Sequence, residues 1–434
     1  MSINKNHSSD NIPQLRFPEF EGEWEKKRLN EISKINPSNQ NLPEWFIYID
    51  LESVKQGLLI KEELILKKEA PSRAQRLLKK GDILFQMVRP YQKNNYFFNE
   101  NKVAVASTGY AQIRTEQNNE FLYQFLHTDE FVKKALLRCT GTSYPAINSN
   151  DLSNISIKYP TLPEQQKIAS FLTAVDEKLT ALKKKKELLE QYKKGVMQGI
   201  FSQNQQSLNH DLPDSHDEHD LKSGKSSQSQ KSRFRQLRFK DENGKEFPNW
   251  QKIKLGELTI KVGKKNKENI PYPVYSINNK EGFLPQSDQF EGMDSNNRGY
   301  DISMYKIIGK NTFAYNPARI NVGSIGFSGE LHDIIISSLY VCFKTRTELE
   351  DGYLMHYLNT FDFNKSVLRN VEGGVRDYLF YENFSNIKIP LPSNKEQTKI
   401  ANFLTAIDNK INQCQQQIEA TSQWKKGLLQ KMFV

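Results

Sequence analysis

The sequence has few cysteines and no long apolar segment. Three cysteines are scattered over 434 residues, at Cys139, Cys342 and Cys414, and none belongs to a Cys-x-x-Cys pair. This excludes a disulfide framework and a zinc site built on paired cysteines, and it favours a reducing, cytoplasmic location. No apolar run approaches the roughly 20 residues that span a membrane. The polar residues 1–11 lack the apolar core of a signal peptide, so we expect none.

Catalytic motifs are missing as well. There is no Gly-x-x-x-x-Gly-Lys-Ser/Thr phosphate loop, no Gly-x-Gly-x-x-Gly after a strand and no Gly-x-Ser-x-Gly elbow. The nearest pattern is Tyr315-Asn316-Pro317-Ala318-Arg319, which lacks the second proline and the following aromatic residue that adenine methyltransferases use to grip a flipped base. We interpret it as a turn at the end of a strand. The sequence therefore predicts no catalytic residue and no metal site in this chain.

The most prominent feature that is present is an internal duplication. Residues 164–201 and 396–433 align without a gap at a constant offset of 232, and 18 of the 38 aligned positions are identical. The two halves also open alike, with Gln14-Leu15-Arg16-Phe17 matched by Gln236-Leu237-Arg238-Phe239. Each opening is followed by a tryptophan, Trp24 or Trp250. The duplication therefore covers both the starts and the ends of the halves.

Both copies of the repeated segment have the seven-residue periodicity of a coiled coil. The seam positions are Ile168, Val175, Leu182, Leu189 and Val196 in the first copy, and Ile400, Ile407, Cys414, Thr421 and Leu428 in the second. We predict long helices over 163–202 and 395–434. Each helix could pack only on its own domain, but the two matching narrow stripes favour pairing of the helices with each other.

Ahead of each helix the sequence predicts a compact α/β (α+β) domain with an irregular, largely antiparallel sheet, at 12–162 and 233–394. Short β-rich runs lie at 45–49, 82–88, 103–106 and 110–113, and at 274–277, 312–315, 323–327 and 334–343. One amphipathic helix follows in each half, at 120–138 and 349–368. The two halves share framework segments, but the loops between these segments differ. This is typical of two related domains that recognise different ligands.

Between the halves, residues 203–232 are rich in Gln, Ser, Asp and His and have no aromatic residue. This composition predicts a flexible linker. His210, His216 and His219 lie among aspartates there, so a metal site is conceivable. The spacing has no fixed frame, however, and we favour a solvated linker.

Charge points to the class of partner. The chain carries 61 Lys and Arg against 51 Asp and Glu, a net charge of +10, which suggests a polyanion. Arg pairs well with guanine edges and Asn with adenine, whereas Lys and Ser suit phosphate. The candidate DNA-binding residues are Arg89, Tyr91, Lys93, Ser143 and Tyr144 in the first domain and Lys264, Arg298, Asn316, Arg319 and Arg376 in the second. For any one of them, the alternative is a solvated surface side chain.

A motif ahead of each helix resembles a known family. Pro160-Thr161-Leu162-Pro163-Glu164-Gln165-Gln166-Lys167-Ile168-Ala169 is similar to the most typical motif of the specificity subunits of type I restriction–modification enzymes. Its second copy reads Ile389-Pro390-Leu391-Pro392, then Glu396-Gln397-Thr398-Lys399-Ile400-Ala401, and departs from the first at residues 393–395 and at Thr398. Neither departure touches the apolar seam. The layout of two variable domains, each followed by a shared helix, resembles the family from Gln14 to Phe433.

The resemblance implies that each variable domain is a target recognition domain that reads half of a bipartite site in double-stranded DNA. The helices would form an antiparallel coiled coil in a pseudo-twofold arrangement, and their length would fix the gap between half-sites. Two modification (methyltransferase) subunits would supply S-adenosylmethionine and the adenine chemistry. Two restriction subunits would supply the ATP-driven motor and the nuclease with its Mg²⁺. The chain itself would be non-catalytic and would bind no cofactor.

Within this scheme we expect Arg89 and Tyr144 to serve the first half-site, and Asn316, Arg319 and Arg376 the second. Four alternatives remain open from the residues alone: a stand-alone two-headed DNA-binding repressor, a coiled-coil scaffold, an enzyme with an unrecognised site, and a remnant without active partners. The DNA target itself is not predicted, because no general code connects such loops to bases.

Overall fold

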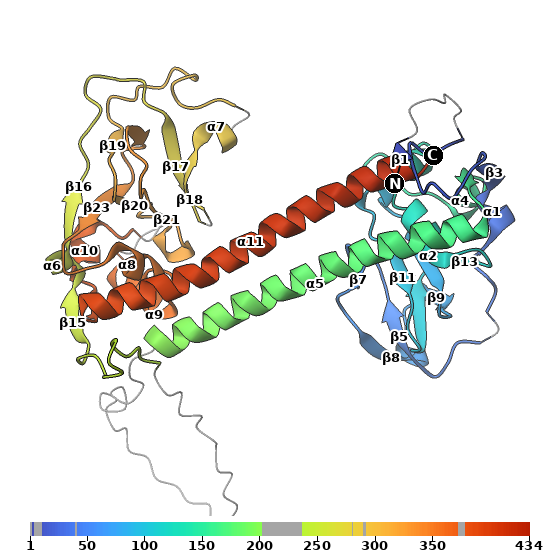
Figure 1. Cartoon of the computed structure of the whole chain (residues 1–434), viewed down its shortest axis with the longest axis horizontal. Helices are drawn as coiled ribbons and strands as arrows, with labels where there is room; N and C mark the ends of the chain where they lie inside the picture. Colours follow the sequence, from blue (N-terminus) through green and yellow to red (C-terminus); the bar gives the residue numbers. More distant parts are fainter. Residues whose placement is uncertain are drawn as a thin grey trace, which may run out of the picture. The chain divides into compact units, whose positions relative to one another are not determined.

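The computed structural model describes residues 2–3, 11–39, 41–201, 237–279, 281–289, 292–371 and 378–434. They form two compact units: the first unit is Met1–Lys185 with Cys414–Val434, and the second unit is Lys186–Gln413. Each of the two long helices, α5 (Leu162–Phe201) and α11 (Asn394–Met432), contributes one part to each unit (Figure 1). The predicted linker 203–232 with its three histidines, and Arg376, lie outside the described residues.

The first unit has a layer of helices on one face of a sheet and a second sheet on the other. Its sheets run in the strand orders β11-β10-β13-β4 and β8-β5-β12-β9, and β14 pairs with β3. The strands are β1 (Ser2–Ile3), β2 (Leu15–Arg16), β3 (Glu25–Arg28), β4 (Ser33–Ile35), β5 (Trp45–Ile49), β6 (Val54–Lys55), β7 (Leu58–Leu59), β8 (Glu63–Leu66), β9 (Ala74–Leu77), β10 (Asp82–Gln86), β11 (Tyr96–Phe98), β12 (Ala104–Ser107), β13 (Tyr110–Thr115) and β14 (Ser156–Tyr159). The shorter helices are α1 (Leu29–Ile32), η1 (Lys67–Glu69), η2 (Pro90–Gln92), α2 (Asn119–Phe125), α3 (Asp129–Leu136) and α4 (Ser149–Ser153).

Alternation along the central strands of the first unit explains these layers. Ile83 and Phe85 of β10 face a core that also contains residues of α2, α3 and both long helices. Leu84, between them in the sequence, faces the second sheet together with Tyr110. Because successive side chains of a strand point to opposite faces, β10 is buried on both sides and separates two cores.

The second unit repeats this plan. Its sheets run β16-β23-β20-β21 and β18-β17-β22-β19, and β15 pairs with β24. The strands are β15 (Gln251–Lys254), β16 (Thr259–Val262), β17 (Val274–Asn278), β18 (Gly282–Pro285), β19 (Lys306–Ile308), β20 (Phe313–Tyr315), β21 (Ile325–Phe327), β22 (Ile334–Ile336), β23 (Val341–Thr345) and β24 (Lys388–Leu391). The shorter helices are α6 (Leu255–Leu258), α7 (Gln286–Gln289), η3 (Ile320–Val322), α8 (Asp351–Tyr357), α9 (Phe361–Asn370) and α10 (Tyr381–Asn386). The predicted mixed fold of two duplicated domains and two long helices is therefore confirmed.

Two details of the sequence prediction are wrong. The single amphipathic helix expected at 120–138, and its counterpart at 349–368, are each two helices. Each break has the same cause, since Thr128 and Thr360 accept a hydrogen bond from the backbone N–H three residues on and so cap a new helix. The run expected as one strand at 334–343 is β22 and β23, which belong to different sheets and are joined by a turn.

Among the strands that the structure describes, pairing is largely antiparallel, as predicted, with one parallel pair in each unit. β5 pairs in parallel with β12 in the first unit, and β17 with β22 in the second. Among the described helices, none combines the length and the apolar composition of a membrane-spanning segment.

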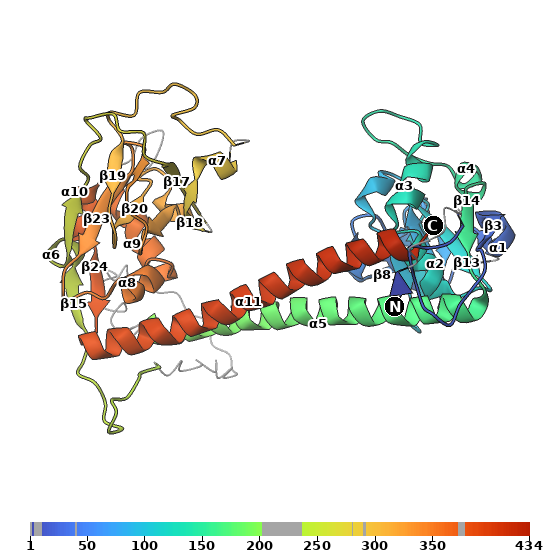
Figure 2. The same ribbon diagram turned by 45° about the horizontal axis from the view of Figure 1, so that its top comes forward.

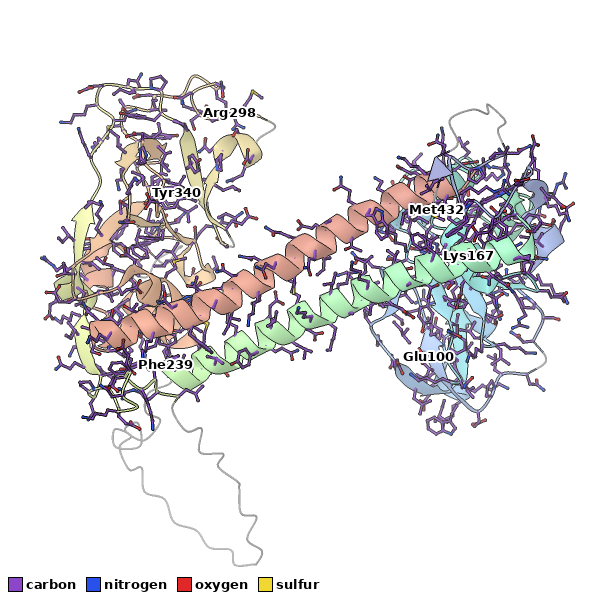
Figure 3. The ribbon with its side chains drawn as sticks, in the orientation of Figure 1. Glu100, Lys167, Phe239, Arg298, Tyr340 and Met432 are labelled. Atoms are coloured by element: carbon purple, nitrogen blue, oxygen red, sulfur yellow. The ribbon has the colours of Figure 1, made fainter. Side chains whose placement is uncertain are left out.

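The long helices pair with each other and also pack on the domains. In the first unit the start of α5 lies beside the end of α11 (Figures 1 and 2), and Phe171 meets Trp424 edge to face at 6.0 Å. Cys414 and Thr421, the weakest seam positions by sequence, are both buried. Figure 3 shows Lys167 of α5 and Met432 of α11 within this same unit. The pairing is antiparallel, because an early part of one helix meets a late part of the other.

Candidate nucleic-acid interface

The Pro-x-x-x-Glu-Gln motif ties the opening of each half to its long helix. Glu164, at 2% exposure, accepts hydrogen bonds from Nε and Nη2 of Arg16, both at 2.8 Å, and from Nε1 of Trp24 at 3.3 Å. In the second unit Glu396 accepts from Nε and Nη2 of Arg238 at 2.8 and 3.0 Å, and Trp250 donates at 2.9 Å. The motif is therefore a buried structural latch and does not face a ligand.

The glutamine after each of these glutamates connects the start of the long helix to a short helix of the domain. Gln165 donates to the carbonyl of Pro160 at 2.8 Å and accepts from the backbone N–H of Asn118 at 3.2 Å. Gln397 donates to the carbonyl of Pro392 at 2.9 Å and accepts from the N–H of Glu350 at 2.8 Å. Asn118 and Glu350 cap α2 and α8, so the latch also fixes the first domain helix.

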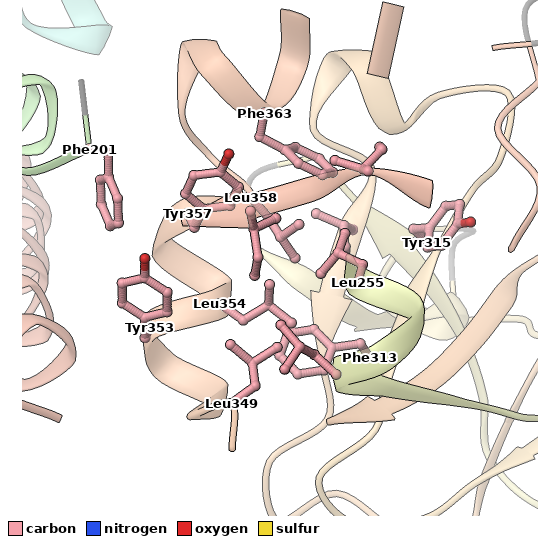
Figure 4. Close-up of a cluster of buried hydrophobic side chains, with 14 of the residues drawn as sticks. Phe201, Leu255, Phe313, Tyr315, Leu349, Tyr353, Leu354, Tyr357, Leu358 and Phe363 are labelled. Carbon is pink, nitrogen blue, oxygen red and sulfur yellow. The ribbon is translucent and has the colours of Figure 1, made fainter. Parts of the chain in front are cut away.

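Each long helix ends in the domain of the other half. Phe433, which directly follows α11, packs against Trp24, Phe121 and Phe125 in the first unit, at ring distances of 5.3 to 6.2 Å. Phe201, the last residue of α5, lies 5.7 Å from Tyr353 and 5.6 Å from Tyr357 in the second unit (Figure 4). The two phenylalanines are 232 residues apart, so the exchange of helix ends is a property of the duplication.

These buried contacts leave the loops of the domains as the candidate interface. In the first unit the connection between β10 and β11, residues 87–95, contains η2. Arg89 precedes η2 with φ 53°, and Lys93 follows it with the same φ. The Cζ atom of Arg89 lies 4.1 Å from the centre of the Tyr144 ring, which is 65% exposed. Tyr91, inside η2, is 49% exposed.

The structure thus brings together most of the first-domain candidates. Ser143 and Tyr144 lie on a hairpin in which Thr140 pairs with Ala146, and this hairpin sits on the Arg89 segment through the Val88–Ala146 bridge. Lys93 is different, because its Nζ donates to Asp129 at 2.6 Å and to the carbonyl of His127 at 2.8 Å. Its charge is already neutralised, and it lowers the pKa of the Asp129 carboxyl through that hydrogen bond.

The second unit places an arginine in the corresponding connection. Residues 316–324 join β20 to β21, as 87–95 join β10 to β11. The side chain of Asn316 accepts from the backbone N–H of Ala318 at 3.0 Å, and its carbonyl accepts from the N–H of Arg319 at 3.0 Å. Arg319 is exposed and directly precedes η3, as Arg89 directly precedes η2. Each hairpin therefore presents an arginine at the entry to a 3-10 helix.

The remaining second-domain candidates lie in other connections. Lys264 is exposed in the segment after β16, where its carbonyl accepts from the N–H of Ile307. Arg298 is exposed in the connection between α7 and β19 (Figure 3). The structure groups Asn316 and Arg319 in one turn but does not bring Lys264 into that turn.

Side chains that brace the Arg89 loop are not evident from the sequence. Gln86, at 3% exposure, donates from Nε2 to Gln92 at 2.9 Å and accepts from the N–H of Asn94 at 3.1 Å. The side chain of Asn95 accepts from the N–H of Gln86 at 2.9 Å. The cluster of Gln and Asn at 86–95 is the only signal in the sequence, and it gives no indication of which side chains meet.

Within the described residues, no three His, Cys, Asp or Glu side chains gather as metal ligands. The histidines at 210, 216 and 219 lie outside those residues, so the prediction of a solvated linker without a metal site stays untested.

Comparisons with known proteins identify the family. The chain matches the family described as type I restriction modification DNA specificity domain twice, over residues 21–191 and 248–421. It is 25% identical to the type I restriction enzyme MjaVIII specificity subunit of Methanocaldococcus jannaschii, covering 99% of this chain and 96% of the relative. It is 22% identical to the MjaIX specificity subunit of the same organism, covering 94% and 92%.

A solved structure shows the same fold. It is the S subunit of a type I restriction–modification system from M. genitalium, which is 15% identical, covers 98% of this chain and 99% of that chain, and superposes with a TM-score of 0.56. The two family matches coincide with the two halves that carry the latched helices and the arginine hairpins. The chain therefore belongs to the type I restriction modification DNA specificity family, with one specificity domain in each half.

Proposed function

We propose that this chain selects the DNA target of a type I restriction–modification complex, with each domain reading one half of a bipartite double-stranded site. The observation that supports the proposal is that both units share one structural framework but carry different exposed loops. The latch, the helix ends and the sheet orders recur in both units, whereas the loops that carry Arg89 with Tyr144 and Asn316 with Arg319 differ. A duplicated frame with unlike loops suits two different half-sites.

The partners in this proposal are two modification subunits and two restriction subunits. The modification subunits dock on the helices and domains and use S-adenosylmethionine to methylate adenine. The restriction subunits use ATP and Mg²⁺. The chain itself supplies no catalytic group and works in the cytoplasm, where the DNA is. The absence of catalytic motifs from the sequence supports this division, as does the net charge of +10 for a DNA partner.

Methylation mapping tests the proposal. The chain is co-expressed with the modification subunit encoded beside it in a host that lacks adenine methylation, and modified bases are mapped by long-read sequencing. We expect a split motif of two short defined segments around a fixed gap, with one methyladenine on each strand. A soluble complex that methylates nothing, or a chain that forms no complex but binds DNA alone, contradicts the proposal.

The helices also set the half-site gap in this proposal. One heptad inserted after Leu182 and one after Cys414, its equivalent 232 residues on, lengthen both helices by about 10 Å and keep their seams in phase. We expect the gap to grow by about three base pairs, since base pairs stack at about 3.4 Å. An unchanged gap with full methylation contradicts the role of the helices as a spacer. A heptad inserted at one site only is the control and should abolish activity.

A further inference from the structure

The backbone around Arg89 is held in an uncommon conformation. Arg89 and Lys93 both have φ 53°, the left-handed region that side-chain-bearing residues rarely adopt, and they flank η2. Such residues persist only where the surroundings determine them, and they concentrate at binding sites. Here the N–H of Arg89 donates to the carbonyl of Pro145 at 2.7 Å, and Lys93 is tied to Asp129. The loop is fixed at both ends before any ligand arrives.

The side chain of Arg89 is ordered as well. Its guanidinium stacks on the Tyr144 ring at 4.1 Å, so one face of the planar group is occupied. Its Nε is buried and, among the residues that the structure describes, has no hydrogen-bond partner. A stack uses the face of a guanidinium and leaves its N–H edge for hydrogen bonds. The Tyr144 ring is exposed and Arg89 is half-buried beside it; with Nε buried, the Nη1 and Nη2 groups are the ones left to meet a ligand.

The hairpin that carries Tyr144 is built on the same loop. The N–H of Ile147 donates to the carbonyl of Met87 at 3.0 Å, and Thr140 and Ala146 exchange hydrogen bonds at 2.9 and 3.0 Å. Gly141 turns the hairpin with φ 86°, where a Cβ atom would lie 3.2 Å from the carbonyl oxygen of Tyr144. Arg89 and Tyr144, distant in sequence, are thus fixed to one another by backbone pairing.

From these features we infer that Arg89 reads a guanine in the first half-site, through paired hydrogen bonds from its guanidinium edge to O6 and N7 in the major groove, with Tyr144 holding the group in plane. The inference rests on the proposed function and assigns the kind of base that this site reads. A planar guanidinium fork matches the two guanine acceptors, and this is the commonest specific contact of arginine with DNA. Lysine cannot reproduce the fork.

A phosphate contact is the competing role for the same side chain. Phosphate contacts need charge more than orientation and carry no sequence information. A phosphate contact would not require the orientation seen here. The Arg89 guanidinium is held by its fixed backbone, by the stack on Tyr144 and by the hydrogen bonds that Gln86 makes within the loop. Arg319 directly precedes η3 in the equivalent hairpin of the second unit, so its substitution provides a matched control directed at the other half-site.

The test compares complexes of the modification subunit with wild-type chain, Arg89→Lys, Arg89→Ala, Tyr144→Phe or Arg319→Ala. We expect Arg89→Lys and Arg89→Ala to accept other bases at one G·C position of the first half-site, with discrimination falling about 5- to 150-fold, the range of one bidentate contact. The second half-site stays unchanged, and Tyr144→Phe keeps full specificity because the ring remains. Arg319→Ala leaves the first half-site unchanged.

A second measurement, at the G·C position that the first one identifies, reads DNA binding instead of methylation. Binding of the wild-type complex to a duplex with 7-deazaguanine at that position, which lacks the N7 acceptor, should weaken at least about fivefold, whereas Arg89→Ala should bind both duplexes equally. An unaltered first half-site in both Arg89 variants overturns the inference. The inference is also overturned if Arg89→Ala lowers methylation without changing the bases read at either half-site while Arg89→Lys stays fully active. That outcome identifies a phosphate contact. If the wild-type complex yields no split motif, the proposed function itself has failed.

Discussion

Asp176 of α5 and Lys425 of α11 form an ion pair between the two long helices, with Oδ1 2.6 Å from Nζ. The pair recurs with the helices exchanged, because Asp408 of α11 lies 2.6 Å from Lys193 of α5. Asp176 aligns with Asp408 and Lys193 with Lys425 at the offset of 232. Opposite charges meet in both places only when the helices are antiparallel in this register. The two pairs therefore favour that register over its alternatives.

Charge reversal should test this selection. Lys425→Asp brings two carboxylates together and should lower the free energy of unfolding of the first unit by about 1 kcal/mol, since the pair is partly exposed. Adding Asp176→Lys should restore most of the loss. Lys178→Asp, an equal charge change at an exposed site of α5, is the control. Urea unfolding of the full chain provides the measurement, and a double variant no more stable than Lys425→Asp contradicts the prediction.

The buried latch should be far more sensitive than an exposed pair. Arg16→Ala leaves the Glu164 carboxylate, at 2% exposure, without its cation and should cost about 3–5 kcal/mol. Replacing both residues by Met should recover part of this loss, because no buried charge then remains. Lys61→Ala removes an exposed partner of Glu63 and should leave the melting temperature nearly unchanged, because exposed ion pairs contribute little to stability. Equal losses for Arg16→Ala and Lys61→Ala in thermal unfolding argue against a buried latch.

Because each long helix ends in the domain of the other half, a substitution at its end should destabilise that other domain. Phe433→Ala should destabilise the first unit by about 3–5 kcal/mol and raise amide hydrogen exchange in α2 (Asn119–Phe125). Phe201→Ala should do the same for α8 (Asp351–Tyr357) in the second unit. Mass-spectrometric exchange of both variants is the measurement, and each serves as the control for the other. If Phe433→Ala opens α8 before α2, the assignment of the helix ends is wrong.

The buried His356 makes stability depend on pH. Burial, with the nearby Lys193 cation adding to it, lowers the pKa of His356 to about 4, although Asp408 opposes this. At neutral pH the imidazole is therefore uncharged, and its 3.9 Å contact with Asp408 is not an ion pair. Unfolded His356 binds a proton below about pH 6.5 and the folded form does not, so its contribution to stability is complete above that pH and falls as pH drops toward 4.

The equivalent position in the first half holds Gln124, which donates to Asp176 at 2.7 Å. His356→Gln should copy that bond and remove about 2 kcal/mol of the loss at pH 5, since each pH unit between 6.5 and the lowered pKa is worth about 1.4 kcal/mol. Melting temperatures of wild type and variant at pH 7.5 and pH 5 provide the measurement. His127, whose pKa burial also lowers to about 4, is present in both proteins and cancels. An equal drop in melting temperature for both refutes the assignment.

The long-range order of this molecule was predictable where residues repeat and unpredictable where they do not. The heptad pattern gives both helices and their pairing, since a narrow apolar stripe needs a partner. The caps at Thr128 and Thr360 were missed, although each Thr precedes an acidic first turn that favours a helix start. The stack of Arg89 on Tyr144 was not predictable, because it depends on a hairpin whose backbone pairing has no local signature. The conformation of these loops depends on such non-local pairings.

The position of Phe433 has a consequence for the order of folding during synthesis. The core of the first unit includes Leu428, Met432 and Phe433, which leave the ribosome after the whole second unit has been made. The core of the domain that is translated first is therefore completed only when the last turn of α11 has been synthesised. A premature stop codon or frameshift that removes the end of α11 would therefore destabilise the first recognition domain. The second recognition domain, although closer to the mutation in the sequence, would keep its core.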